Sequence, residues 1–368
     1  MTTNGAAAYV SYSDSLEQLQ PDEDALVEKI LASMMRVNRL VGDRHRHGVR
    51  DAHAKSHGIL RGELVVAADL PPHLRQGVFA KAGSYPVMVR LSTAPSDIQS
   101  DRIPAPRGMA IKLLGVDGDK LLPDDESRNQ DFLLVNHPVI PFGHVKAYWD
   151  VQQLAEKSDG SPETLLRIAA AVARGASQLF KAARVEVPAA LEAIAATNEH
   201  LLGETYHSMA ALRFGDYVAK LSVAPASDSV RALTGKPLPA DHKDSVLRDL
   251  VVDHFQRHGA EYELRAQLCT SIEDMPIEDA SVEWSADKSP HQPVARLVLP
   301  AQAAYSDARR IYGDDVLSFS PWRGLAAHRP LGSIMRIRRA AYEQSSRARH
   351  AMNLTPRVEP SDIAELPA

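Results

Sequence analysis

Two groups of four strand-like segments, separated by a long helical stretch, constrain the fold of this 368-residue chain most strongly. The first group lies at 59–67, 87–92, 108–116 and 132–136, and the second at 209–214, 217–223, 260–270 and 294–299. Turn-prone residues separate many of these segments, which favours antiparallel neighbours. Eight strands with such short connections predict an antiparallel sheet closed into a barrel, because closure removes the exposed edges.

Helical patterns interrupt and flank the strands. The segments 142–157, 162–184 and 188–200 are rich in alanine, begin with proline or a polar cap, and have helical periodicity. Apolar residues also recur at helical spacing over 22–41, and a last helix is expected at about 333–352. The predicted fold is therefore α+β: an eight-stranded antiparallel β-barrel with a helical insertion and flanking helices. We expect a flexible arm over 1–20, one domain over 21–355 and a mobile tail over 356–368.

Composition excludes several classes of protein. The chain is 44% hydrophobic and 24% charged, which is typical of a globular protein, and it has no apolar run long enough to span a membrane. No secretory signal is visible, so the cytoplasm is the predicted location. The single cysteine, Cys269, excludes a disulfide framework and any multi-cysteine metal site. A net charge of −5 argues against general nucleic-acid binding.

Two residue pairs at opposite ends of the chain are candidates for chemistry. Arg50 precedes His53 by three positions, and Arg338 precedes Tyr342 by four. A tyrosine has a pKa of about 10, and an arginine one helical turn away favours its phenolate form. Tyrosinate is one of the few axial ligands that proteins use for haem iron. The two pairs therefore predict a haem held from one side by Tyr342, with His53 acting on the other.

With these pairs in place, the chain resembles the catalase superfamily of haem proteins, in its small single-domain branch, over residues 44–349. Five strings carry the resemblance in the order that the family has them. They are RDAHAK at 50–55, VRLST at 89–93, RGMAIK at 107–112, Asn129 followed by DFLLV at 131–135, and RRAAY at 338–342.

The resemblance implies roles for the residues that would meet the iron and the peroxide. His53 matches the distal histidine, which moves a proton between the two oxygens of a peroxide, and a pKa near 6.5 suits an imidazole to this work. Ser92 matches the serine that fixes the other ring nitrogen, and Asn129 matches the distal amide that polarises the peroxide. Tyr342 matches the iron ligand, with Arg338 as its charge partner.

The resemblance also implies how the cofactor, haem b, would be held. Arg50, Arg90 and Arg349 match the basic residues that pair with the haem propionates, a task that suits the forked guanidinium group. Phe142 lies where the family has an aromatic ring stacked on the porphyrin.

One departure from the family shapes the predicted reaction. Ala52 precedes the distal histidine where the large catalases usually carry a valine, so we expect a wider distal pocket. The predicted function is a haem-dependent peroxidase with some catalase activity, which reduces hydrogen peroxide or organic hydroperoxides with a small organic reductant. An NADPH site is not expected, and a homodimer is possible. The alternative on the same fold is a rearrangement of fatty-acid hydroperoxides of the allene oxide synthase type.

Two further readings come from other classes of function. A histidine cluster (His45, His47, His53 and His57) could bind a metal without haem, but neighbouring arginines would repel a cation. An arginine-rich terminal helix could bind nucleic acid or acidic partners through Arg336, Arg338, Arg339, Arg347 and Arg349. The acidic net charge and the scarcity of aromatic residues argue against this reading.

Overall fold

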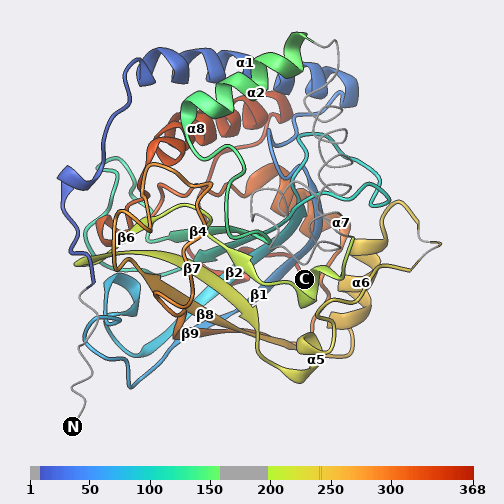
Figure 1. Ribbon diagram of the computed structural model, residues 1–368. Helices are drawn as coiled ribbons and strands as arrows, with labels where there is room; N and C mark the ends of the chain where they lie inside the picture. Colours follow the sequence, from blue (N-terminus) through green and yellow to red (C-terminus); the bar gives the residue numbers. More distant parts are fainter. Residues whose placement is uncertain (1–8, 158–197, 240, 242) are drawn as a thin grey trace, which may run out of the picture.

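A closed β-barrel forms the centre of the protein (Figure 1). The computed structural model describes residues 9–157, 198–239, 241 and 243–368. Its strands are β1 (Lys55–Val66), β2 (Gly83–Thr93), β3 (Arg107–Leu113), β4 (Gln130–Val135), β5 (Tyr206–His207), β6 (Leu212–Phe214), β7 (Tyr217–Pro225), β8 (Ala260–Leu268) and β9 (Gln292–Leu299). They form one antiparallel sheet in the order β5-β4-β3-β2-β1-β9-β8-β7-β6. Because β5 also pairs with β7, eight strands close into a ring and β6 extends β7 as a hairpin. The predicted eight-stranded antiparallel barrel is confirmed.

The second group of strands differs from the prediction in one place. Of the single strand expected over 209–214, only 212–214 is strand, as β6, and the separate short strand β5 precedes it at 206–207. Between them, Met209 adopts a positive φ of 61°, and the Ser208 hydroxyl accepts a hydrogen bond from the Leu221 amide. This local turn separates β5, which pairs with β4 and β7, from β6, which forms a hairpin with β7.

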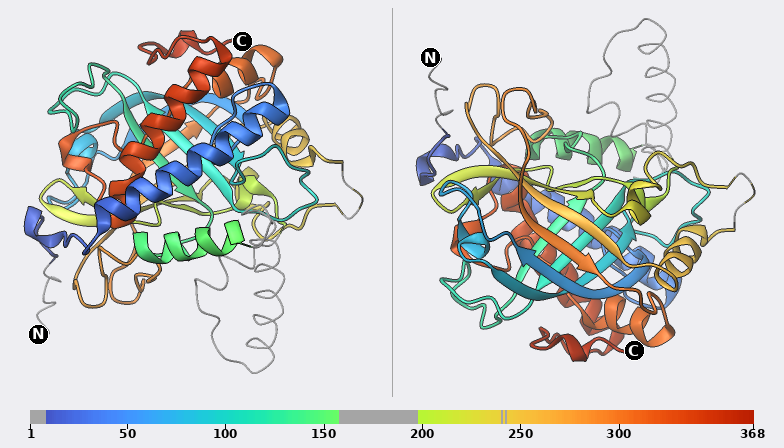
Figure 2. Two further views of the ribbon diagram at one scale, coloured as in Figure 1. Left: turned by 90° about the horizontal axis from the view of Figure 1, so that it is seen from above. Right: turned by 90° about the horizontal axis from the view of Figure 1, so that it is seen from below.

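Three helices cover one flank of the barrel. They are α1 (Glu23–His45), α2 (Val145–Lys157) and α8 (Ser333–Asn353), and they lie side by side in both views (Figures 1 and 2). Ile30 of α1 and Val145 of α2 pack with Ile337 of α8 in one buried apolar cluster. These helices confirm the patterns at 22–41 and 333–352 and most of that at 142–157. The expected helices at 162–184 and 188–200 fall almost entirely outside the described residues.

The remaining helices are short, and the sequence pattern does not predict them. They are α5 (Asp228–Arg231), α6 (Val246–Phe255) and α7 (Asp307–Ile311), followed by a π-helical turn, Tyr312–Val316. Both α6 and α7 contact β1. In the described part of the chain, no helix has the length and apolar character needed to cross a membrane.

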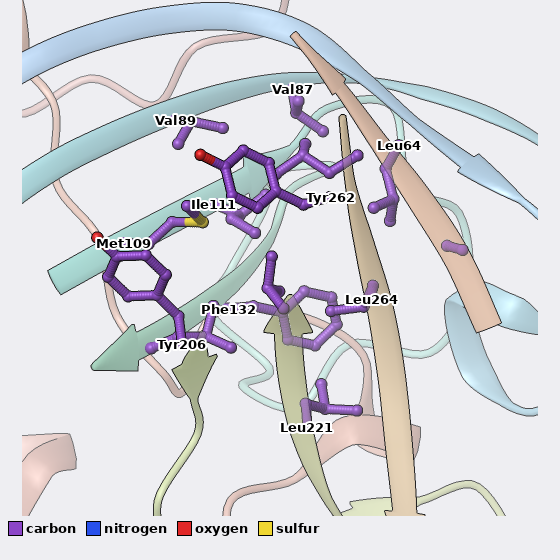
Figure 3. Close-up of a cluster of buried hydrophobic side chains, with 14 of the residues drawn as sticks. Leu64, Val87, Val89, Met109, Ile111, Phe132, Tyr206, Leu221, Tyr262 and Leu264 are labelled. Carbon is purple, nitrogen blue, oxygen red and sulfur yellow. The ribbon is translucent and has the colours of Figure 1, made fainter. Parts of the chain in front are cut away.

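The barrel interior is filled by large apolar side chains (Figure 3). Val87 and Val89 of β2 point inward with Ile111 of β3 and Leu264 of β8, and all four are at most 1% exposed. Because side chains alternate along a strand, the residues between them point to the outer face. On β2 these are Met88, Arg90 and Ser92, each at most 2% exposed. Strand β2 is therefore buried on both faces, since another layer covers its outer side.

The strand register aligns functional side chains on that outer face. Arg90 of β2 pairs with Ala110 of β3, and Ser92 pairs with Gly108. On the next strand, Val135 of β4 pairs with the same Gly108. The resulting strip of β2, β3 and β4 lies beneath α8, so the barrel wall and this helix face each other.

Both ends of the described chain pack against the barrel, contrary to the expected flexible arm and mobile tail. The amide of Val10 donates to the Cys269 carbonyl at 2.8 Å, and Tyr12 packs on a buried cluster that contains this cysteine. In the tail, Glu359 forms ion pairs with the buried Lys112 and with Arg323. Such long-range contacts leave no pattern in the local sequence. The polar composition of the two ends therefore predicts mobility although both ends are packed.

Candidate active site

A cavity lies between the outer face of strands β2–β4 and helix α8. Its wall consists of Arg50, Asp51, Ala52, His53, Arg90, Ser92, Gly108, Met109, Ala110, Leu133, Leu134, Val135, Ser318, Phe319, Arg338, Tyr342, Ser345, Ser346 and Arg349. Seven of the nine predicted site residues are among them. The cavity has a free volume of about 70 Å³, which is room for several water molecules of about 10–15 Å³ each on this measure. The structure thus brings residues from both ends of the chain to one small space.

His53 is held in place by its backbone and by two strands. It adopts a positive φ of 57°, and its amide donates to the Ala94 carbonyl at 2.9 Å. Its Nδ1 lies 3.1 Å from the Ser92 hydroxyl, so one ring nitrogen is engaged and the ring orientation is fixed. A left-handed conformation is uncommon for a residue with a side chain, and the surrounding contacts must stabilise it.

Gly108 lets β3 approach the imidazole. A Cβ at this position would lie 2.5 Å from the Nδ1 and Cε1 atoms of His53 and 2.9 Å from the Ser92 hydroxyl. We therefore predict that Gly108→Ala displaces the His53 ring and breaks its bond to Ser92. The peroxide reaction proposed below should fall at least 10-fold, while the protein stays folded because the barrel core is on the other face of β3. Ala110→Ser, two residues along the same face, is the matched control; an equal loss in both variants would contradict the steric argument.

Tyr342 and Arg338 form the pair that their spacing on α8 indicates. The Arg338 guanidinium donates to the Tyr342 hydroxyl at 2.6 Å, and its carbon lies 5.1 Å from the centre of the ring. The phenol oxygen therefore accepts a hydrogen bond from a charged donor. The tyrosine is half-buried, with its side chain in the cavity wall.

Three buried arginines converge on the π-helical turn. Arg90 binds the Asp314 carboxylate through two nitrogens at 2.9 and 3.0 Å. Arg50 and Arg349 donate to backbone carbonyls of residues 313–317, and the Arg50 Nε has no acceptor. Burial, followed by the charges of Arg349 and Arg90, lowers the pKa of Arg50 well below its usual value. Asp314 is the carboxylate bound directly to Arg90, while Asp51 and Asp315 act on Arg349 through their charges. Among the described residues the Arg50 Nε stays without an acceptor, which an anionic ligand would supply.

The same positive charges act on His53. Burial, followed by Arg90, Arg338 and Arg50, lowers the pKa of the imidazole to about 3. The ring is therefore neutral at ordinary pH. A neutral imidazole can accept a proton, which a permanently protonated one cannot.

Asn129 and Phe142 do not line this cavity. Asn129 precedes the far end of β4, where Gln130 pairs with Leu113, and its amide donates to the Pro360 carbonyl at 3.0 Å. Phe142 lies between β4 and α2, outside the cavity wall. The asparagine at the His53 end of β4 is Asn136, whose Oδ1 accepts the Arg107 amide at 2.7 Å. The pairing of Val135 with Gly108 brings Asn136 to this end of β4.

The histidines of the proposed metal cluster are separated. His45 binds Asp97 and His47 binds Asp315, while His57 lies 2.5 Å from the Thr93 hydroxyl. No group of three or more metal-ligating side chains occurs in the residues that the structure describes. The non-haem reading therefore has no assembled ligand set in this part of the chain.

The arginine-rich terminal helix is also engaged within the protein. Arg336 binds the carboxylates of Glu17, Glu23 and Glu278, and Arg349 is buried. Together with the pairing of Arg338 and Tyr342, these contacts leave little of the basic character free for nucleic acid.

Comparison with known proteins gives the fold. No family model matches the sequence, and no curated protein matches it. Solved structures do: a fungal catalase (16% identity, TM-score 0.54), a bacterial catalase (14%, 0.55) and catalase A from Saccharomyces cerevisiae (15%, 0.53). The fold is catalase-like. The matches cover 93–97% of this chain but only 66–70% of those chains, so it spans about two thirds of their length. At this identity the likeness establishes the catalase-like fold alone.

The sequence resemblance implies haem as the cofactor. The side chains of this cavity suit haem, but the volume of the cavity does not. The phenol with its cationic neighbour and the uncharged imidazole suit an iron between them. The three arginines suit two propionates, because in the described part of the chain they bind only one carboxylate directly. However, about 70 Å³ is far too small for a porphyrin, and the side chains of Arg50 and Arg349 in the cavity wall are bonded to the π-helical turn. These side chains must therefore move when a large ligand enters.

Proposed function

We propose that this protein is a haem b enzyme that consumes peroxide, with peroxidase activity and some catalase activity. The observation that supports this most strongly is the meeting of His53 and Tyr342 in one cavity, although 289 positions separate them. Each has the partner that its role needs, Ser92 for the imidazole and Arg338 for the phenol. The proposal goes beyond the catalase-like fold, which the comparisons show.

In this proposal the side chains have separate tasks. Tyr342, with Arg338 beside its hydroxyl, would hold the iron. Arg50, Arg90 and Arg349 would pair with the propionates. The bound haem supplies the redox chemistry that peroxide reduction requires.

His53 moves the proton. Its neutral ring accepts the proton of the peroxide from one oxygen and returns it to the other as that oxygen leaves. Ser92 keeps the ring in the orientation that permits both steps. Asn129 and Phe142 line no part of this cavity, so the proposal gives neither of them a role in it. A homodimer and a cytoplasmic location stay sequence predictions.

The test is peroxide consumption by the haem-loaded protein between pH 5 and pH 9. Because the pKa of His53 is about 3, the imidazole is the neutral base throughout this range and loses that form only as the pH falls toward 3. We expect the rate constant for hydrogen peroxide to change less than about 3-fold over the range, with an aromatic donor oxidised as peroxide disappears. A 10-fold fall below pH 6.5 would contradict the account of His53.

The same experiment separates the alternative reaction. A rearranging enzyme would convert a fatty-acid hydroperoxide without any reductant and would leave hydrogen peroxide and the donor untouched. That outcome would replace the proposed function while leaving the haem site in place.

A further inference from the structure

We infer that a second cavity, on the other side of Tyr342, binds a small phenolic carboxylate that serves as the electron donor. This inference rests on the proposed function and names its donor class. The second cavity, called the donor cavity below, has a volume of about 820 Å³. Sites for small molecules commonly have volumes of 300–1,000 Å³, so the donor cavity needs no rearrangement to admit one.

The donor cavity shares a wall with the active-site cavity. Ser318, Phe319, Tyr342 and Ser346 line both spaces. A molecule in the donor cavity is therefore separated from the proposed haem site by single side chains, one of which is the proposed iron ligand. An electron can cross such a wall without the donor entering the cavity that contains His53.

An aromatic side chain and a cation stand together in the donor cavity. Trp322 is held by a hydrogen bond from its indole nitrogen to the Met335 carbonyl at 2.7 Å, and it is 6% exposed. The Arg339 guanidinium lies over this ring, 5.6 Å from its centre. An arginine stacked on an indole leaves its outward nitrogens available for a carboxylate.

The charge pattern singles out Arg339. The other arginines of the wall are paired with carboxylates: Arg128 with Asp117, Arg323 with Asp131 and Glu359, and Arg347 and Arg357 with Glu343. Among the described residues, no carboxylate pairs with Arg339. A ligand with one negative charge would complete the pattern, and guanidinium binds carboxylate through two parallel hydrogen bonds.

Asn129 supplies a second polar contact. It lines the donor cavity, is 1% exposed, and its Oδ1 is buried without a hydrogen-bond donor in the described structure. A buried acceptor without a partner is destabilising, so a small movement of this amide toward a ligand hydroxyl would be favourable. A carboxylate at Arg339 and a hydroxyl at Asn129, joined by an aromatic ring near Trp322, define a phenolic acid.

The reaction balances with peroxide as oxidant. Two phenol molecules each give up one electron and one proton and become phenoxyl radicals. Hydrogen peroxide takes up the two electrons and two protons, its O–O bond breaks, and two water molecules form. No other reductant is required.

Binding can be measured without peroxide, which separates this inference from the proposed function. We would titrate the haem-loaded protein with 4-hydroxybenzoate and with the uncharged 4-hydroxybenzamide by calorimetry. Arg339→Gln should weaken the binding of the acid at least 10-fold and the binding of the amide less than 2-fold. Arg257→Gln, at an exposed arginine in the turn after α6 and outside both cavities, is the matched control and should change neither affinity. Equal affinities of wild type and Arg339→Gln for the acid would overturn the inference.

Fluorescence and kinetics locate the site. Bound 4-hydroxybenzoate should quench the emission of the wild type and of Trp284→Phe, which removes a tryptophan elsewhere in the fold, but not that of Trp322→Phe. With peroxide, Arg339→Gln should raise the KM for the acid about 10-fold while the rate of the peroxide step is unchanged. If peroxide does not react at all, the proposed function fails and the binding results still decide the site. If the acid binds normally but Trp322→Phe is still quenched, the ligand lies elsewhere and the inference is wrong.

Discussion

His53→Ala should lower the rate of the peroxide reaction about 10²- to 10⁴-fold, the range that a positioned acid–base group contributes. The imidazole is the neutral base of the cavity, and a strand hydroxyl fixes its ring. Haem content should stay at the wild-type level, because the proposed ligand, Tyr342, is on the opposite wall. Stopped-flow absorbance after mixing with hydrogen peroxide measures the rate.

Ser92→Ala is the companion to this variant. It keeps the imidazole but removes the hydroxyl 3.1 Å from Nδ1, so it should lower the rate about 10-fold, less than the loss of the ring itself. A His53→Ala protein that reacts with peroxide at the wild-type rate would show that another group moves the proton.

Lys112→Met should destabilise the folded protein by about 3–5 kcal/mol, as is usual when one partner of a buried ion pair is removed. Lys112 has no exposed surface and lies 2.8 Å from both Asp131, which is equally buried, and Glu359. Although burial by itself favours the neutral acid, Lys112 and Arg323 hold the pKa of Glu359 at about 2. Without the ammonium group, two carboxylates would lie in the barrel wall with Arg323 as their main cationic partner.

Urea unfolding monitored by circular dichroism measures the change. Lys146→Met, which removes one partner of the exposed Lys146–Asp150 pair, is the matched control and should cost less than about 1 kcal/mol. Equal effects of the two substitutions would mean that the buried network does not stabilise the packed tail. The same network also predicts that stability falls as the pH drops from about 4.5 toward 2, where Glu359 takes up its proton.

The sequence predicts the barrel well because strands carry a local signal. Alternating apolar residues and turn residues locate seven of the eight expected strands to within a few residues. This holds even for β2, which is buried on both faces. The late start of the strand expected over 209–214 depends on the backbone conformation of Met209, which no propensity indicates. The α8 pair of Arg338 and Tyr342 is equally local, since four residues make one helical turn.

The contacts between distant segments could not be predicted from the sequence. Asn129 is one residue from the strand that borders the site, but register places it at the end of β4 away from His53. Asp314 meets Arg90 across 224 positions, and Glu359 meets Lys112 across 247. Such pairs form only when the barrel brings their segments together. The packing of the tail and the bonding of the buried arginines to residues 313–317 are therefore known only from the structure.

The central claim is that Tyr342 holds a haem iron opposite His53. The most direct measurement is the absorption spectrum of haem-loaded wild type beside that of Tyr342→Phe, with Tyr148→Phe as a control for the loss of a partly buried phenol from α2. We predict a ferric tyrosinate spectrum in the wild type and in the control, and a loss or change of iron ligation in Tyr342→Phe. An identical spectrum in wild type and Tyr342→Phe, or a wild type that stays colourless when haem is supplied, would contradict the account.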